Sequence, residues 1–287
     1  MEAELIRLSS GNGEIAALIY RASRPRGVIV VSSAMGVSQN FYRPFAEWLA
    51  QLGYVVFTFD YRGVGLAAPK SLRGYEANIF DWARDCETVI EFASAQLPRT
   101  PLYWVGHSLG GQLLGLIRNR ERISRVITIA AGNGYWLLNS WPTRRVVWWL
   151  WFVAVPIATR VAGYFPGKRL RKVGDLPRGV IEQWRRWCLH PEYMVGVEGE
   201  GVRAGYASVS MPMTSLSFTD DEMMTEASIR ALHALYIATK VDFHRIGPPD
   251  IGAQRIGHFG FFRPQFEQTL WTLVPKWLGD DQRRGEI

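Results

Sequence analysis

The residues best suited to chemistry are a serine and two glycines that follow an apolar run. Residues 103–105 are typical of a strand, the segment from Gly106 to Gly110 has the pattern G-x-S-x-G, and residues 112–118 are typical of a helix. A sharp strand-to-helix turn of this kind exposes its serine at the carboxyl edge of a sheet. A side chain at either glycine should collide with neighbouring backbone. Ser108 is therefore the predicted nucleophile.

A serine hydroxyl is a weak nucleophile, so it needs a base that is itself oriented by an acid. After such a turn the acid and the histidine follow the serine in that order. His107 is adjacent to the nucleophile and cannot turn back onto it, while His190 lies in a cationic insertion and His233 in a helix-like segment. His244 ends a strand-like run, where a cross-strand partner is expected. His258 lies in a loop directly before a helix-like run, so it is the predicted base.

The acid should follow a strand that lies between the serine and the base. Residues 213–218 have the pattern of that strand. Counting one turn residue, Phe218, and two variable residues selects Asp221. A register change of one residue selects Asp220 instead, and the sequence leaves both open. The aspartate that is not used should cap a helix that begins near Met223.

An oxyanion needs two backbone amides pointed at it. The first should come from Leu109, the residue after the nucleophile. The second should come from the small-residue loop 32–37 that follows the apolar run 27–31, and Met35 is the best placed donor. Asp60 also ends an apolar run, but it precedes the serine in the chain, so we interpret it as structural.

These segments together resemble the α/β-hydrolases of the serine-hydrolase type. The resemblance covers residues 27–120 and 205–280 and is nearest to the serine-aminopeptidase-like and lysophospholipase-like branches. It is carried by Ala34-Met35-Gly36, Asp60-Tyr61-Arg62-Gly63-Val64-Gly65, Gly106-His107-Ser108-Leu109-Gly110-Gly111, Asp220-Asp221 and Gly257-His258-Phe259-Gly260-Phe261-Phe262. It implies a doubly wound, mostly parallel sheet, a Ser-acid-His triad and no cofactor. One departure is Ser33-Ala34, where many members begin the oxyanion loop with His-Gly.

The order of strand-like and helix-like runs predicts the same α/β class. Residues 4–8 and 14–20 flank Gly11-Asn12-Gly13, which is typical of an antiparallel hairpin. Apolar strands that alternate with amphipathic helices then indicate a parallel sheet covered on both faces. The strand-like runs are 27–31, 54–59, 102–105, 125–130, 213–218 and 236–243, and the helix-like runs are 41–52, 79–95, 109–118, 225–235 and 264–278. We expect a hydrolase core of residues 1–132 and 206–287, interrupted by a helical cap of residues 133–205.

Composition favours a single cytoplasmic enzyme domain. The 287 residues are 48% hydrophobic, which suffices for one large core. The acidic start, Met1-Glu2-Ala3-Glu4, does not have the pattern of a signal peptide. Cys86 and Cys188 lie far apart, which favours a reducing compartment, and no metal-ligand spacing is present. No nucleic-acid-reading motif accompanies the basic charge, so nucleic acid is not an expected partner.

The cap is predicted to hold most of the basic charge and of the tryptophans. Its ten Lys/Arg between Trp136 and His190 are Arg144, Arg145, Arg160, Lys168, Arg169, Arg171, Lys172, Arg178, Arg185 and Arg186. Against Asp175 and Glu182 they give a local balance of +8, while the whole chain carries +7. Tryptophan with arginine suits either a weak contact with a membrane surface or an amphiphilic anionic substrate. The alternative is an ordinary cap helix with its arginines in solvent.

One apolar run of the cap, residues 146–158, has thirteen residues and contains Pro156. A bilayer-spanning helix needs about 20 residues. We therefore expect a cap helix that lines an apolar substrate site and is kinked or ended near the proline.

The predicted activity is hydrolysis of a carboxylic ester or thioester through an acyl-enzyme, with an apolar, amphiphilic or aromatic small-molecule substrate. The same triad could serve an aminopeptidase or amidase, or an acyltransferase. A non-catalytic protein that binds an apolar ligand is the alternative from another class.

Overall fold

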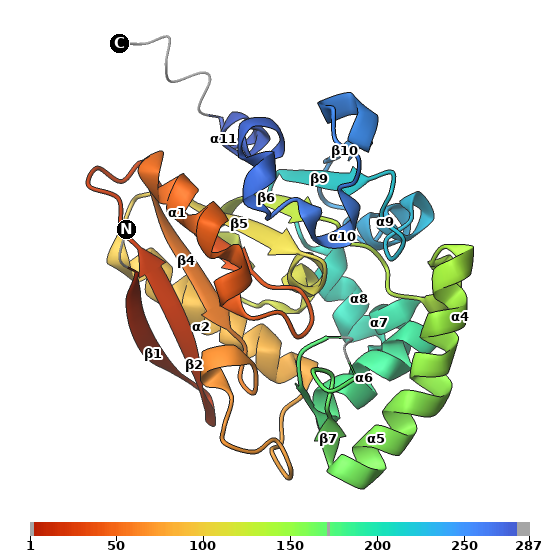
Figure 1. Ribbon diagram of the computed structural model, residues 1–287. Coiled ribbons are helices and arrows are strands. Elements are labelled where there is room, and N and C mark those ends of the chain that lie inside the picture. The colour runs from red at the N-terminus through yellow and green to blue at the C-terminus, as the bar shows by residue number, and fades with distance from the viewer. Residues whose placement is uncertain (1–2, 171–172, 280–287) are drawn as a thin grey trace.

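Eight strands form one sheet in the computed structural model, which describes residues 3–170 and 173–279 (Figure 1). The strands are β1 (Glu4–Ser10), β2 (Gly13–Tyr20), β3 (Gly27–Ser32), β4 (Tyr54–Asp60), β5 (Leu102–His107), β6 (Ile123–Ile129), β9 (Met213–Phe218) and β10 (Val241–Ile246). Their order across the sheet is β1-β2-β4-β3-β5-β6-β9-β10. The pairs β1–β2 and β2–β4 are antiparallel and all the others are parallel. This confirms the predicted α/β-hydrolase fold with its N-terminal hairpin.

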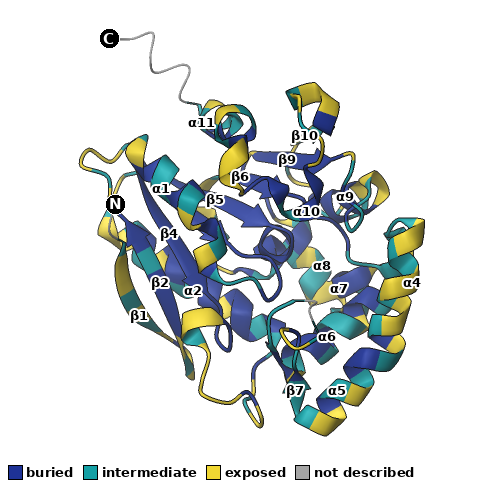
Figure 2. Cartoon of the chain, in the orientation of Figure 1, coloured by how far each residue is buried: buried dark blue, intermediate teal, exposed yellow. Residues whose placement is uncertain are grey.

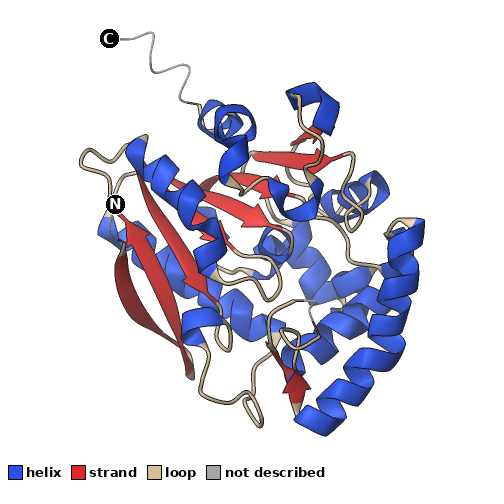
Figure 3. Cartoon of the chain, in the orientation of Figure 1, coloured by secondary structure: helices blue, strands red, loops and turns tan. Residues whose placement is uncertain are grey.

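Alternate residues of the central strands enter two separate apolar clusters. In β4, Phe57 and Phe59 belong to one cluster and Tyr54 and Val56 to the other. This alternation is the expected consequence of a strand buried on both faces. Helices lie on both sides of the strands in Figure 3. They are α1 (Arg43–Gln51), α2 (Ile79–Gln96), α3 (Leu109–Gln112), α9 (Glu226–His233), α10 (Gly257–Gly260) and α11 (Leu273–Trp277), with shorter helical turns η1 (Gln39–Tyr42), η2 (Gly65–Ala67), η3 (Leu113–Leu116), η4 (Arg120–Arg122), η7 (Pro248–Ile251), η8 (Pro264–Phe266) and the π-turn η9 (Glu267–Trp271).

Two predicted boundaries are wrong for a tertiary reason. The helix expected over residues 109–118 changes to the 3-10 turn η3 and ends before Ile117, where Gly115 lies so close to the Tyr206 ring that a Cβ would be 2.2 Å from it. The strand expected over 236–243 begins only at Val241. Tyr236 is instead buried, and its hydroxyl donates to Gly111 O at 3.3 Å.

The chain between β6 and β9 forms a helical layer beside the sheet (Figure 1). It contains η5 (Trp136–Leu138), α4 (Trp141–Trp149), the π-turn η6 (Leu150–Ala154), α5 (Val155–Ala162), the short strands β7 (Tyr164–Phe165) and β8 (Leu176–Pro177), α6 (Arg178–Leu189), α7 (Tyr193–Glu198) and α8 (Glu200–Ala207). Arg171 and Lys172, two of the predicted cap cations, lie outside the described residues. We propose residues 133–205 as the cap, with the boundaries predicted from the sequence.

The helices α4 and α5 run end to end through η6, from Trp141 to Ala162. The helix therefore extends beyond the thirteen-residue apolar run at both ends: it has 22 residues, and an 18-residue window within it has a mean hydropathy of 1.3. Among the described residues it is the one helix long and apolar enough to cross a membrane, judged by length and composition alone. Pro156 does not end it, since the π-turn just before the proline accommodates the missing N–H.

A buried ion pair joins the N-terminal hairpin to α2. The Arg62 side chain is 2% exposed and its Nη2 lies 2.7 Å from Asp85 Oδ1. Arg62 Nη2 also donates to Ser10 O at 2.6 Å, and Nη1 donates to Asn12 Oδ1 at 2.8 Å. Burial raises the pKa of Asp85, while the hydrogen bonds from Arg62 act in the opposite direction. Because its partners lie on β1, in the hairpin turn and on α2, this arginine fixes the hairpin against α2.

Replacing Arg62 with methionine should therefore lower the free energy of unfolding by about 3–5 kcal/mol, because the Asp85 carboxylate would stay buried without its cation. Urea denaturation measures the change. The matched control is Arg118→Met, which breaks the ion pair with Glu87 at a side chain that is 78% exposed and should change stability little. Equal losses in the two variants would contradict the structural role of Arg62.

Candidate active site

The turn between β5 and α3 holds Ser108 in a strained backbone conformation. Its φ is 50° and its ψ is −112°, values that few non-glycine residues adopt. A Cβ on Gly110 would lie 2.2 Å from Ser32 O, and one on Gly106 would lie 2.5 Å from Gly110 O. The predicted collisions at both glycines are confirmed. The sheet edge, the serine and the helix can approach this closely only because both positions lack a side chain.

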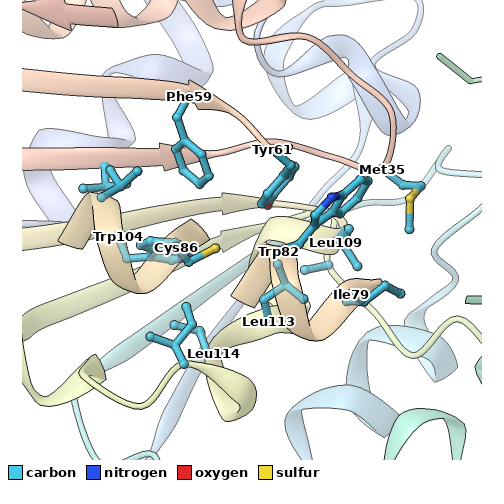
Figure 4. Close-up of a cluster of buried hydrophobic side chains, with 14 of the residues drawn as sticks. Met35, Phe59, Tyr61, Ile79, Trp82, Cys86, Trp104, Leu109, Leu113 and Leu114 are labelled. Carbon is cyan, nitrogen blue, oxygen red and sulfur yellow. The ribbon is translucent and has the colours of Figure 1, made fainter. Parts of the chain in front are cut away.

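The two residues predicted to supply oxyanion amides have their side chains anchored in the core. Figure 4 shows Met35 and Leu109 within the same buried cluster as Trp82. Within the described chain, neither the Met35 amide nor the Leu109 amide donates a hydrogen bond to the protein. The neighbouring Ala34 amide is occupied, since it donates to the Tyr42 hydroxyl at 2.8 Å. The geometry leaves the two predicted amides available, and their role stays a prediction.

The predicted base and one of the two candidate acids are in contact. The His258 Nδ1–H donates to Asp221 Oδ2 at 2.8 Å, and the two side chains are 3% and 1% exposed. Asp221 Oδ1 accepts the amides of Met223 and Met224 at 2.8 and 2.9 Å. In the described chain, Ser108 Oγ and His258 Nε2 have no hydrogen-bond partner. The His258–Asp221 contact is the half of a triad that orients the base, and the pairing of His258 with Ser108 stays a prediction.

The alternative acid, Asp220, does not contact the histidine ring. Its carboxylate accepts the amide of Ile256 at 2.8 Å and that of Gly257 at 3.0 Å, so it holds the loop that carries the base. The expectation that the unused aspartate caps a helix near Met223 is wrong. The helix α9 begins three residues later, and Thr225 caps it by accepting the Ser228 amide.

A buried chain of hydrogen bonds links the oxyanion loop to the base, and sequence reasoning missed it. The Ala34 amide donates to the Tyr42 hydroxyl, which lies 2.8 Å from His107 Nδ1, and His107 Nε2 lies 3.0 Å from His258 O. A carbonyl only accepts, so His107 donates through Nε2 and its Nδ1 accepts from Tyr42. Burial, with the charge of His258 as a smaller cause, holds the pKa of His107 well below its ordinary value. A neutral His107 therefore positions the base instead of acting as one.

The other histidines lie away from this arrangement. His233 lies on α9, as predicted, where Nε2 is 2.9 Å from Thr128 Oγ1 and Nδ1 is 2.7 Å from Ile229 O. Burial lowers the pKa of His233 to about 4. His244 lies on β10 beside Asp242 Oδ2, and His190 caps the end of α6. None of the three contacts Ser108.

Asp60 has the structural environment that its place in the sequence suggests. Its Oδ1 accepts the Gln39 amide at 2.8 Å, and its Oδ2 accepts the Leu66 amide at 2.8 Å. Gly65 passes so close that a Cβ there would be 2.2 Å from the carboxylate. The carboxylate thus joins η1 to the loop after β4, away from the base.

A hollow of about 630 Å³ lies between the N-terminal end of α2 and α6. Its lining includes Tyr75, Asp81, Arg178 and Glu182, but neither Ser108 nor His258. This hollow therefore lies apart from the predicted nucleophile and base.

Comparison with known proteins identifies the family of this chain. The family described as "Serine aminopeptidase, S33" matches residues 23–169, slightly more than half of the chain. A protein of Variovorax paradoxus, "Putative carbamate hydrolase RutD", is 33% identical over 113 residues. The "Monoacylglycerol lipase" of Mycolicibacterium smegmatis is 28% identical over 90 residues. These matches cover 39% and 31% of this chain, and the chain spans only 38% and 31% of those two relatives.

A solved structure covers nearly the whole fold. A soluble variant of monoglyceride lipase from Saccharomyces cerevisiae, in complex with a substrate analogue, superposes with a TM-score of 0.67. The likeness covers 98% of this chain and 95% of that one, at 16% identity. At this identity the likeness shows the α/β-hydrolase fold alone.

Exchanging each aspartate for asparagine should separate the two candidate acids. Asp221→Asn should slow the reaction of the serine with a fluorophosphonate probe by about 10³- to 10⁴-fold, because the histidine loses the partner that fixes its tautomer. Asp220→Asn keeps one acceptor oxygen for the Ile256 and Gly257 amides and should cost less than about tenfold. A larger loss in the Asp220 variant would contradict the assignment of Asp221.

The buried His233 should make stability depend on pH. Because its pKa in the folded chain is about 4 while the unfolded value is near 6.5, the unfolded state binds more protons between these values, and stability falls as the pH falls through them. Between pH 7 and pH 4.5 the loss should be about 2 kcal/mol of unfolding free energy. Urea denaturation of His233→Gln at both pH values should show a smaller loss, and His244→Gln, at a half-exposed site, should match the wild type.

Proposed function

Because the chain belongs to the serine aminopeptidase S33 family of α/β-hydrolases, we propose that it is a serine hydrolase that cleaves carboxylic esters or thioesters. The observation that carries this proposal is the buried hydrogen bond between His258 Nδ1 and Asp221 Oδ2, on a loop held against the strained turn of Ser108. A histidine oriented by a carboxylate, together with a serine on a strained strand-to-helix turn, is the apparatus of acyl transfer.

In this mechanism His258 Nε2 takes the proton from Ser108 Oγ as the oxygen attacks the carbonyl carbon. The amides of Leu109 and Met35 bind the oxyanion of the tetrahedral intermediate. Asp221 stabilises the imidazolium, which then protonates the leaving alcohol or thiol as the carbon–heteroatom bond breaks. His258 then takes a proton from water as the water oxygen attacks the acyl carbon, and the imidazolium returns that proton to Ser108 Oγ as the acyl–Oγ bond breaks and the acid leaves. The reaction consumes the ester or thioester and one water without a change of oxidation state, so it requires no cofactor.

The substrate we propose is a small apolar, amphiphilic or aromatic ester. The cap that covers this family's sites is here rich in aromatic side chains, with Trp151 and Trp187 buried in it. The lipase relative of Mycolicibacterium smegmatis supports an ester, although its match covers less than a third of this chain. The carbamate hydrolase relative supports amide-like bonds as a second candidate for the bond that is cleaved.

Cleavage of peptides from a free N-terminus fits the described cap less well, despite the family's descriptive name. A site for an ammonium group needs an unpaired carboxylate. The five acidic residues of the cap all have partners: Asp175 accepts the Lys168 amide, Glu182 pairs with Arg178, Glu192 and Glu200 pair with Arg203, and Glu198 Oε1 accepts from the side chains of Gln183 and Trp187. We therefore place ester hydrolysis before aminopeptidase or amidase activity. Transfer of the acyl group to another acceptor uses the same triad.

We propose the cytoplasm as the compartment. Cys86 and Cys188 are both free and buried, which suits a reducing environment. Burial raises the pKa of both thiols well above the ordinary value, so neither is a competing nucleophile.

Labelling with a fluorophosphonate probe tests the activated serine. The wild type should be labelled, and Ser108→Ala and His258→Ala should each lose the label while keeping a wild-type urea transition. Ser71→Ala, a matched change at an exposed serine, should leave the label unchanged. A folded wild type that takes no label would contradict the proposal and favour a protein that only binds an apolar ligand.

Profiling with nitrophenyl esters tests the acyl preference. We expect kcat/KM to rise from acetate to medium-chain esters, because each additional methylene buried against apolar side chains contributes about 0.8 kcal/mol. A sharp preference for acetate would contradict the apolar site. Adding an alcohol or thiol acceptor and measuring the ratio of acid to transferred product separates hydrolysis from acyl transfer.

A further inference from the structure

The outer side of the helix formed by α4, η6 and α5 carries an uninterrupted row of exposed aromatic, aliphatic and basic side chains. We name this row the outer face, and it consists of Trp141, Arg145, Trp148, Trp149, Phe152, Ile157, Arg160 and Val161. Trp141 and Val161, at its two ends, are 70% and 71% exposed. Figure 2 shows this exposed side pointing away from the rest of the molecule. Apolar side chains of this size are rarely gathered in solvent without a partner.

The π-turn keeps the row on one side of the helix. From Trp141 to Phe152 the exposed apolar positions follow helical spacing, but the step from Phe152 to Ile157 is five residues. In a regular helix such a step would rotate Ile157 and Val161 away from the row. A π-turn widens one turn of the helix to i→i+5 hydrogen bonding, so a five-residue step stays on the same face.

The opposite side of the helix is fixed to the cap. Trp151, Val155 and Thr159 are buried, and Arg185 Nε on α6 donates to Trp151 O at 2.5 Å. The helix is therefore held as a rigid edge of the molecule, and only its outer face is available to a partner.

The outer face is basic as well as apolar. Residues 141–162 contain Arg144, Arg145 and Arg160 and no aspartate or glutamate. Near the N-terminal end of α4, the arginines Arg144 and Arg145 line a shallow apolar groove with tryptophans. The full lining of that groove is Trp136, Leu137, Trp141, Arg144, Arg145 and Trp148. The complementary partner must therefore be negatively charged at its surface and apolar beneath it.

We propose that the outer face is a docking surface for an anionic lipid bilayer, with the helix lying in the plane of the interface. The indole rings would enter the headgroup region while the guanidinium groups pair with lipid phosphates. A second copy of the chain fits less well, because a two-fold contact would place these arginines against their own copies. A spanning orientation would require Trp151, Val155 and Thr159 to leave the cap core.

The docking face is coupled to the candidate active site at one end. Ser140, just before α4, donates through its hydroxyl to Glu222 O at 3.0 Å, and Glu222 follows the predicted acid Asp221. Thr225 Oγ1 donates to Leu138 O at 2.6 Å across the same junction. The two hydrogen bonds place the Trp141 end of the outer face beside the acid loop. Docking itself does not depend on the proposed esterase activity.

Flotation with lipid vesicles tests the proposal. The full chain should float with vesicles of phosphatidylcholine containing 30% phosphatidylglycerol, bind pure phosphatidylcholine vesicles at least about tenfold more weakly, and dissociate at about 1 M salt. Ser108→Ala should bind as the wild type does, so this result is independent of whether the chain is a hydrolase.

Two pairs of variants assign the binding to the outer face. Trp141→Ala/Trp148→Ala should bind anionic vesicles at least about tenfold more weakly. Leu5→Ala/Ile237→Ala, on β1 and in the turn before β10, removes exposed apolar side chains elsewhere and should bind normally. Arg145→Gln/Arg160→Gln should also lose about tenfold, whereas Arg24→Gln/Arg99→Gln, at exposed positions away from the cap, should not.

Four outcomes would overturn the proposal. The first is a wild type that floats with neither kind of vesicle, and the second is an equal loss of binding in the outer-face and control variants. The third is a dimer in sedimentation that the Trp141→Ala/Trp148→Ala change dissociates, because the outer face would then be a contact between copies. Protein that alkaline carbonate cannot extract from the vesicles would show a spanning helix and would equally contradict docking in the plane.

Discussion

The close approach of β3, β5 and α3 at one point is the constraint on which the rest of the site depends. A Cβ on Gly110 would overlap the Ser32 carbonyl, and the serine between the two glycines has a positive φ. Such a conformation persists only where the surrounding structure fixes it. Here Ser108 N donates to Ile129 O at 2.9 Å, and Trp104 Nε1 donates to Gly110 O at 3.0 Å. The turn is therefore held from the strand before it and from the neighbouring strand β6.

The predicted base is held beside this turn by hydrogen bonds that take no part in the proposed reaction. Asp220 holds the amides just before His258, and His107 holds the His258 carbonyl from the other side. Asp221 is then free to orient the ring. The two adjacent aspartates thus have different partners: Asp220 binds the backbone of the loop and Asp221 binds the imidazole. A neutral His107 suits this role, since a second charged imidazole 5.2 Å from the first would oppose formation of the imidazolium.

The cap connects this site to the surface of the molecule. Its long helix buries one side against the cap core and exposes the other. The π-turn lets the helix continue through Pro156 with the buried and the exposed residues each kept on one side. The contact of Ser140 with Glu222 joins the start of that helix to the acid loop. The same segment can therefore cover a substrate site and, as we propose, meet a lipid surface.

The sequence by itself determined the fold class, the hairpin, the nucleophile turn and the order of the candidate triad, because each depends on local periodicity or on glycine at fixed spacing. It left both Asp220 and Asp221 open as the acid, because a shift of one residue in the turn after β9 would exchange which of the two side chains faces His258. It missed Tyr42, whose partner His107 is 65 residues away, and it misjudged the length of the cap helix at Pro156.

Only the tertiary structure decided these matters, because they depend on which distant backbone groups meet. The His258 loop is fixed by an aspartate that lies 36 and 37 residues before the two amides it binds, and by an imidazole 151 residues before His258. Likewise, the helix over 109–118 was shortened where Gly115 meets the Tyr206 ring. Local propensity sets which elements can form, while close packing between remote segments sets where they end and what their side chains face.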